Sequence, residues 1–174
     1  SYQSSDILIR NSRFIGASDL SLYGISGLNA NIFFTMAATV KVQNVEARYF
    51  HGSFIQEAGF NSVIENNTIT DSTCDAGDGC VYSYNDVNYV VRRNVFDRVR
   101  GSTIFPVIHV RRTSATTQPA GVLAYNNTII SMGDVLNQEI AMGWRAMTGS
   151  SYPTGNSVFF NNIVMNAANA SLGT

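Results

Sequence analysis

The chain has 174 residues, of which 45% are hydrophobic and only 13% charged, and its formal net charge is −1. Globular domains usually carry roughly twice that charged fraction, so hydroxyls and amides must supply the polar surface, as suits secreted proteins that meet sugars. The near-neutral charge excludes a global field that would favour nucleic acid or an anionic membrane, and no apolar run reaches the roughly 18 residues of a membrane span.

A six-residue motif recurs along the chain: an apolar residue, any residue, Asn, a polar residue, any residue and an apolar residue. In chain order it occupies 9–14, 42–47, 64–69, 91–96, 124–129 and 159–164. Successive copies start 22 to 35 residues apart. A variable period around a constant motif is typical of stacked repeats that carry inserted loops.

Each repeat contains two further expected strands. Apolar stretches precede the motif at 31–35, 53–57, 80–84, 107–111 and 140–144, and short strands follow its Asn at 14–15, 49–50, 96–99 and 129–130. Strands this short cannot bury their faces alone, so they must stack on neighbouring repeats. No helical periodicity persists beyond two turns. A sandwich of antiparallel hairpins is the alternative, but it leaves the recurring Asn unexplained.

These features predict an all-β fold: a right-handed parallel β-helix of about six coils. It forms a single domain over 1–174, a segment of a longer extracellular protein. The first residues of the six motifs should then stack in one inward row, about 4.8 Å apart. These are Ile9, Val42, Ile64, Val91, Ala124 and Phe159.

The Asn of the motif has a conformational reason. A sharp bend between two strands needs a residue that tolerates the left-handed region and hydrogen-bonds its own backbone. Stacked repeats bring these amides above one another, where they can form a ladder. Asn66, Asn126 and Asn169 also begin Asn-x-Ser/Thr sequons and are candidate glycosylation sites. We expect Asn66 and Asn126 to be buried in the ladder instead.

The only two cysteines, Cys74 and Cys80, enclose a short Gly-containing loop. No CxxC or zinc pattern is present, so a disulfide is favoured over two free thiols, in keeping with an oxidising compartment. The loop carries Asp75 and Asp78. With Asp71 these carboxylates are weak candidates for a metal site, although turn formation is the favoured role of the loop acids.

The repeats resemble those of the pectin-lyase-like superfamily of parallel β-helix proteins, over nearly the whole chain. The most specific stretch runs through 67–71 and 77–82. It is similar to the Gly-Asp-Asp-Cys segment of polygalacturonases, but Gly79 replaces the second Asp of the catalytic pair, so that activity is not carried over. Calcium-dependent lyases of the superfamily use clustered carboxylates with a basic residue. The resemblance therefore implies that Asp71, Asp75 and Asp78 could bind Ca²⁺, while no cofactor is required.

A candidate binding patch emerges when the strands before each motif are aligned. We expect Phe54, Val81 and Ile108 to share one inward row and Gln56, Ser83 and Val110 another. Alternation would then place the intervening residues on the exterior. The resulting patch comprises Glu57, Tyr82, Tyr84, His109 and Arg111. Its aromatic rings could stack on pyranose rings, and its charged and imidazole groups could bind a carboxylate or transfer a proton. The alternative is a solvated sheet face stabilised by cross-strand stacking.

Two functional classes are consistent with these features. The first is a non-catalytic secreted or cell-surface module that acts as a rigid scaffold or binds a carbohydrate or another extracellular protein. The second is a polysaccharide lyase or glycoside hydrolase acting on an acidic polysaccharide. Unpaired edge strands also predict end-to-end or homo-oligomeric association. Neither nucleic acid nor a membrane span is expected.

Overall fold

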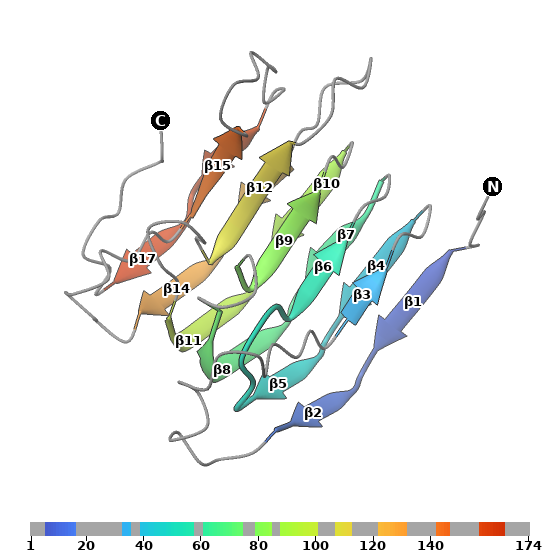
Figure 1. Cartoon of the computed structure of the whole chain (residues 1–174), viewed down its shortest axis with the longest axis vertical. Helices are drawn as coiled ribbons and strands as arrows, with labels where there is room; N and C mark the ends of the chain where they lie inside the picture. The colour runs from blue at the N-terminus through green and yellow to red at the C-terminus, as the bar shows by residue number, and fades with distance from the viewer. Residues whose placement is uncertain are drawn as a thin grey trace.

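The computed structural model describes residues 6–16, 33–35, 39–57, 61–74, 79–84, 88–100, 107–112, 122–131, 142–146 and 157–165. Throughout these ranges the regular structure is β-strand, without a helix, and each of the fourteen strand pairings is parallel. Figure 1 shows the repeats following one another in chain order along a stack, with β1 and β2 at one end and β15 and β17 at the other. The predicted all-β class is confirmed.

The strands form three sheets, which the chain visits in turn. Sheet A consists of β1 (Ile7–Arg10), β4 (Val40–Gln43), β7 (Val63–Glu65), β10 (Tyr89–Arg92), β13 (Val122–Tyr125) and β16 (Val158–Phe160). Sheet B consists of β2 (Arg13–Ile15), β5 (Glu46–Arg48), β8 (Thr68–Thr73), β11 (Val95–Arg100), β14 (Thr128–Ser131) and β17 (Ile163–Met165). Sheet C consists of β3 (Phe33–Thr35), β6 (Ile55–Glu57), β9 (Val81–Tyr84), β12 (Ile108–Arg112) and β15 (Met142–Ala146).

The predicted inward row of sheet A is confirmed. Its successive members are direct partners across the six strands, from Ile9 through Val42, Ile64, Val91 and Ala124 to Phe159. The four central members are fully buried, whereas Ile9 and Phe159 on the end strands are only partly buried. One apolar cluster contains this row together with buried residues of sheets B and C, such as Phe96 and Val81. The three sheets therefore share a core.

The bend between sheets A and B is the turn that the motif predicts. The third residue of the motif has a left-handed backbone conformation in every repeat, with φ between 51° and 56°. These residues are Asn11, Asn44, Asn66, Arg93, Asn126 and Asn161. Asn suits this region because its side chain hydrogen-bonds locally. These six side chains are exposed. The expectation that Asn66 and Asn126 are buried is therefore wrong, and both sequon asparagines face solvent; Asn169 lies outside the described residues.

The buried amide ladder belongs to the next position of the motif. Asn67, Asn94, Asn127 and Asn162, here called the Asn ladder, lie one above another. Asn94 shows the pattern: its Oδ1 accepts from the backbone N–H (3.0 Å) and Nδ2 (2.9 Å) of Asn67. Its Nδ2 donates to the Ile64 carbonyl (2.9 Å) and to Asn127 Oδ1 (3.0 Å). A buried amide needs hydrogen-bond partners for its oxygen and its nitrogen, and these contacts supply them. The ladder is therefore formed by the fourth residue of the motif and not by the third.

The predicted disulfide between Cys74 and Cys80 is confirmed. Both cysteines are fully buried members of the shared core. Cys74 follows β8 and Cys80 precedes β9, so the bond joins the end of a sheet B strand to the start of a sheet C strand. Asp75 and Asp78, which the bond encloses in sequence, lie outside the described residues.

Candidate functional site

The predicted patch on sheet C has a partly correct register. Tyr82 pairs with His109 and Tyr84 pairs with Arg111, as expected. In the preceding strand, however, Val81 pairs with Ile55 rather than Phe54. The expected row was therefore wrong by one residue at β6, and Glu57 lies beside Ser83 instead of sharing a row with Tyr84.

Tyr82 and His109 lie on the face of sheet C that was predicted, but the expectation that this face is exposed there is wrong. Tyr82 is 1% exposed and His109 is fully buried, and their ring centroids lie 5.1 Å apart at an interplanar angle of 33°. Val81 and Ile108 belong to the shared core, while alternation puts Tyr82 and His109 on the opposite face of sheet C. Both faces of this part of the sheet are thus covered. The side chains of Glu57, Tyr84 and Arg111 lie outside the described part, and their role in binding stays a prediction.

The predicted metal ligand Asp71 lies in a cluster of charged side chains on sheet B. Arg98 binds both of its carboxylate oxygens, with Nε–Oδ1 2.6 Å and Nη2–Oδ2 3.0 Å, and Arg48 Nη2 lies 3.3 Å from Oδ2. Arg98 also pairs with Asp97. We call Arg48, Asp71, Asp97 and Arg98 the Asp71 cluster. No convergent group of three or more His, Cys, Asp or Glu side chains occurs among the described residues.

Asp71 remains ionised through these contacts. Hydrogen bonds from Arg98 lower the pKa of its carboxyl most, burial partly opposes them, and Arg48 adds to the lowering. The same contacts raise the pKa of Arg98. Two guanidinium groups already neutralise this carboxylate and would repel an approaching cation. The arrangement therefore suits a charge cluster better than a calcium site.

A continuous row of polar and aromatic side chains crosses the outer face of sheet A. It occupies the second position of each motif, and its members are register partners throughout. We call it the Glu65 row: Arg10, Gln43, Glu65, Arg92, Tyr125 and Phe160. Alternation directs this row away from the apolar inward row that it follows in sequence.

The centre of the Glu65 row is a hydrogen-bonded chain. Gln43 Nε2 donates to Glu65 Oε1 (2.5 Å), and Arg92 Nε donates to Glu65 Oε2 (2.6 Å). Arg92 Nη1 donates to the Tyr125 hydroxyl (2.8 Å), and the Tyr125 ring stacks on Phe160 with centroids 4.9 Å apart. The row thus joins five strands, and Phe160, 41% exposed, presents apolar surface at its end.

Electrostatics keep Glu65 charged as well. Burial alone would raise the pKa of its carboxyl, but hydrogen bonds from Arg92 and Gln43 and the charges of Arg92 and Arg93 together bring it below its ordinary value. The hydrogen bond to Tyr125 and the pairing with Glu65 raise the pKa of Arg92. A general acid needs a raised carboxyl pKa. The pKa of Glu65 is lowered instead, so this residue is not suited to that role.

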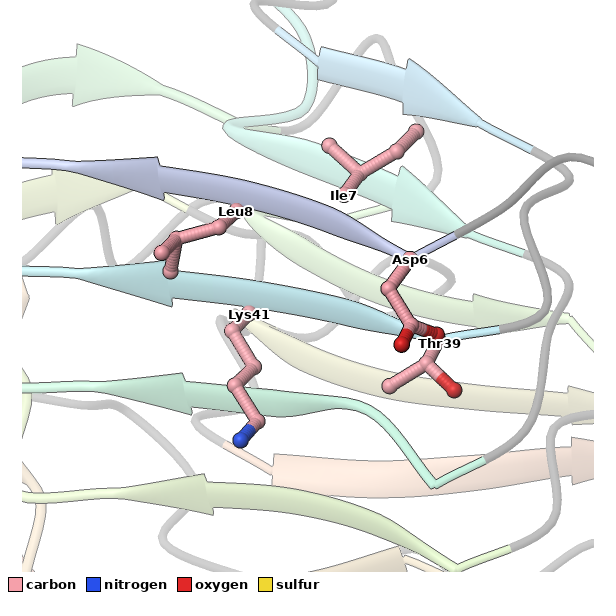
Figure 2. Close-up of a pocket in the computed structure, with 5 residues that line it drawn as sticks. All are labelled: Asp6, Ile7, Leu8, Thr39 and Lys41. Carbon is pink, nitrogen blue, oxygen red and sulfur yellow. The ribbon is translucent and has the colours of Figure 1, made fainter.

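A second outward row, mostly apolar, runs beside the Glu65 row. Its members are Leu8, Lys41, Val63, Val90, Leu123 and Val158. At the start of β1 and β4 a hollow of about 270 Å³ is lined by Asp6, Ile7, Leu8, Thr39 and Lys41. Figure 2 shows Leu8 and Lys41 on one side of these strands and Ile7 on the other. The hollow therefore offers mainly apolar surface at the N-terminal end of the stack.

Sequence reasoning missed the Glu65 row although the signal was available. The motif alignment already places its second positions in one row. The residue types at these positions differ from repeat to repeat, so the alignment alone shows no shared constraint on them. What unites them is pairwise complementarity, such as that of Glu65 with Arg92, rather than a shared residue type.

The chain matches no model of a protein family, no curated protein and no solved structure. In the part of the chain that the structure describes, no helix is long and apolar enough to cross a membrane. The function must therefore be inferred from the geometry of the residues themselves.

Proposed function

We propose that this chain is a non-catalytic module of a secreted or cell-surface protein, which acts as a rigid scaffold and binds an acidic carbohydrate on its outer surface. Its architecture would be a right-handed parallel β-helix of about six coils, of the pectin-lyase-like kind. The single observation that carries the non-catalytic part is the pairing of the described strand carboxylates with arginine.

The proposed β-helix has topological support. Successive strands of each sheet are separated in sequence by one strand from each of the other two sheets. Parallel strands of one sheet are joined by right-handed crossovers in nearly all proteins, which favours the right hand. The Asn ladder links four repeats and requires their turns to be stacked in register.

The strand carboxylates whose side chains the structure describes are not arranged for acid–base catalysis. Glu46, Glu65, Asp71 and Asp97 each form an ion pair with an arginine. Hydrolysis of a glycosidic bond ordinarily needs two carboxyl groups, one of them a protonated acid with a raised pKa. Glu65 and Asp71 instead have lowered values. A binding role agrees with this tuning, because a permanently ionised group positions its neighbouring arginine.

Charge favours an acidic glycan on the outer face of sheet A. Arg10, Lys41 and Arg92 lie in the two outward rows, and the exposed Arg93 lies at the adjoining turn. Glu65 is the one carboxylate among the described residues of these rows. Uronate carboxylates pair well with guanidinium groups, and the neighbouring apolar row offers surface for sugar C–H groups. The buried disulfide supports an oxidising, extracellular setting.

The test compares binding of oligouronates with that of neutral oligosaccharides. Arg93→Asn restores the residue that five other repeats carry at this left-handed position, so it removes a charge without straining the turn. Together with Arg10→Gln, it should weaken oligouronate binding about tenfold, the equivalent of ~1.4 kcal/mol. Titration calorimetry measures the affinity, and melting temperature reports the fold.

The matched control is Arg13→Gln, which removes an exposed arginine from sheet B. It should leave oligouronate binding unchanged. If the sheet A variants bind as well as wild type, the site is elsewhere, and Tyr84 with Arg111 becomes the next candidate. Release of unsaturated or reducing products by the wild-type protein would instead favour the lyase or hydrolase function, with Ca²⁺ addition testing the loop carboxylates.

A further inference from the structure

Arg93 is the single departure from asparagine among the six left-handed turn residues between sheets A and B. Asparagine tolerates this conformation because its short polar side chain hydrogen-bonds locally, an option that arginine lacks. The Arg93 side chain is exposed and forms no hydrogen bond or ion pair with the residues that the structure describes. A charged side chain at a position that disfavours it, without a bonded neighbour to stabilise, points to a role in binding.

The preceding residue, Arg92, is held in place and still has N–H groups to offer. Its Nε donates to Glu65 Oε2 (2.6 Å), and its Nη1 donates to the Tyr125 hydroxyl (2.8 Å). Among the described residues Nη2 has no hydrogen-bond partner, and the side chain is 33% exposed. A guanidinium that two partners already fix loses little conformational freedom when its remaining N–H groups bind an anion.

The Tyr125 hydroxyl adds a neutral donor on the next strand of sheet A, where Tyr125 is the register partner of Arg92. Because its oxygen accepts from Arg92, the hydroxyl can donate its own hydrogen to a ligand. The ring is fixed by stacking on Phe160 at an interplanar angle of 8°. The hydroxyl is therefore held close to the Arg92 guanidinium before any ligand arrives.

Glu65 does not cancel the positive charge of this group. It is one carboxylate beside two guanidinium groups, because Arg92 bonds it directly and Arg93 is close enough for its charge to act on it. The Glu65 side chain is only 11% exposed, whereas that of Arg93 is exposed. The surface thus presents a net positive charge with several donors, which suits an oxyanion.

Neutral amides flank this positive group along the turn. Asn66 and Asn126 occupy the positions one repeat before and one repeat after Arg93, and backbone hydrogen bonds keep these turns in register. Asn44 and Asn161 continue the row, and all four side chains are exposed. An amide exchanges hydrogen bonds with sugar hydroxyls but cannot neutralise a carboxylate. A glycan that follows the turn would therefore meet one cation among amides.

We propose that Arg92, Arg93 and the Tyr125 hydroxyl form a subsite for one carboxylate, and that the glycan bound there carries isolated uronate units between neutral sugars. The neutral sugars would contact Asn66 and Asn126 on either side. A homopolymer of uronates would instead place carboxylates over these amides, where they would lose water without gaining a charged partner. This assignment rests on the carbohydrate binding proposed above and specifies the class of glycan.

The experiment compares three trisaccharides by titration calorimetry with the full chain. The first has a single central glucuronate between neutral hexoses, the second is the same molecule with its carboxyl group reduced to an alcohol, and the third consists of uronates only. Wild type should bind the first at least as tightly as the third, and about tenfold more tightly than the second. A clear preference for the all-uronate trisaccharide overturns the proposal.

Tyr125→Phe keeps the ring and its stacking but removes the hydroxyl. It should weaken binding of the single-glucuronate trisaccharide about tenfold and change that of the reduced molecule little. Equal weakening of both would mean a general disturbance of sheet A and overturns the proposal. The matched control is Tyr49→Phe, which removes a hydroxyl that lies 3.5 Å from Arg48 Nη2, beside sheet B. A loss of binding in this control overturns the proposal as well.

Asn126→Arg tests the preference for isolated uronates. It adds a cation one repeat from Arg93, at a turn position of the kind that already accommodates arginine. The variant should shift the preference toward the all-uronate trisaccharide by about threefold. An unchanged preference would contradict the role given to the flanking amides.

The outcomes separate this subsite from the proposed function. If wild type binds no acidic trisaccharide, the proposed function fails and the subsite fails with it. If the acidic trisaccharides bind but Tyr125→Phe leaves their affinity unchanged, the proposed function stands and only the subsite is overturned. Circular dichroism and melting temperature confirm that the variants fold.

Discussion

The Asn ladder and the charged contacts of the outer faces stabilise the same stack in different ways. In the ladder, neutral amides repeat one bonding pattern from strand to strand, and Asn67, Asn94 and Asn127 are each 1% exposed. In the Asp71 cluster and the Glu65 row, each contact joins different residue types, and the side chains of Arg48, Arg92 and Arg98 are 31% to 53% exposed. The first network is sheltered from water, pH and salt, whereas the second responds to all three.

The largest loss of stability is expected when a side chain of the Asn ladder is truncated. Asn94→Ala removes the acceptor of two Asn67 donors and the donor to Ile64 and Asn127. Because unsatisfied buried groups each cost roughly 1–3 kcal/mol without adding fully, we expect a loss of about 3 kcal/mol in the free energy of unfolding. Denaturant unfolding followed by circular dichroism measures it.

Asn66→Gly is the control for the ladder variant. Asn66 is exposed and left-handed, with φ of 56°, and glycine adopts this conformation freely. We expect a change within about 0.5 kcal/mol. A comparable loss for both variants would mean that the turn conformation, rather than the buried amide network, holds the repeats together.

An intermediate effect is expected at Glu65. Glu65→Gln removes the charge that accepts from Arg92 and Gln43, and we expect a loss of about 2 kcal/mol at neutral pH. The pKa of Glu65 is depressed in the folded state, so its stabilisation is complete above the unfolded value of 4.5 and is lost as pH falls through the lower folded value. Wild type and variant should therefore converge in stability as the solution is acidified below 4.5.

The convergence can be checked with unfolding curves from neutral pH downward. The Asn94→Ala variant provides the contrast, because its deficit should change little over the same pH interval. A Glu65→Gln deficit that persists in strong acid would show that the side chain acts through packing and not through its charge.

The smallest effect is expected in the Asp71 cluster. Asp71→Asn leaves the exposed Arg98 and the partly exposed Arg48 without their shared carboxylate, but solvent reaches both side chains, so we expect a loss of about 1 kcal/mol. Glu46→Gln, at the more exposed pair with Arg13, should cost less than about 0.5 kcal/mol. High salt should shrink both losses, measured as changes in melting temperature, while leaving that of Asn94→Ala in place. A salt-independent Asp71 deficit would contradict the screened-charge account.

The accuracy of the sequence prediction differs between the sheets for a physical reason. In sheet A the motif supplies an apolar residue followed two positions later by a turn residue, so the inward row from Ile9 to Phe159 could be aligned without ambiguity. Sheet C lacks such a turn marker. A one-residue error in the alignment of 53–57 therefore put Phe54 in the place of Ile55 and moved Glu57 to the wrong neighbours.

Burial on the outer side of sheet C could not be obtained from alternation. A period of two predicts that Tyr82 and His109 face away from Val81 and Ile108, which is correct, but it does not reveal whether that face meets solvent or protein. Similarly, the sequence Asn-Asn-Thr at 66–68 predicts a turn, but either asparagine could be the one that is buried. Only the stacking of neighbouring turns distinguishes the exposed Asn66 from the buried Asn67.

The sequence by itself determined the β-strand class, the repeat and its inward row on sheet A, and the disulfide, because these depend on local patterns and on residue types with few alternatives. The tertiary structure decided which amide enters the ladder, which arginine neutralises which carboxylate, and which aromatic rings are buried. Those choices depend on register between strands 22 to 35 residues apart. A shift of one residue there exchanges every neighbour while leaving the local pattern intact.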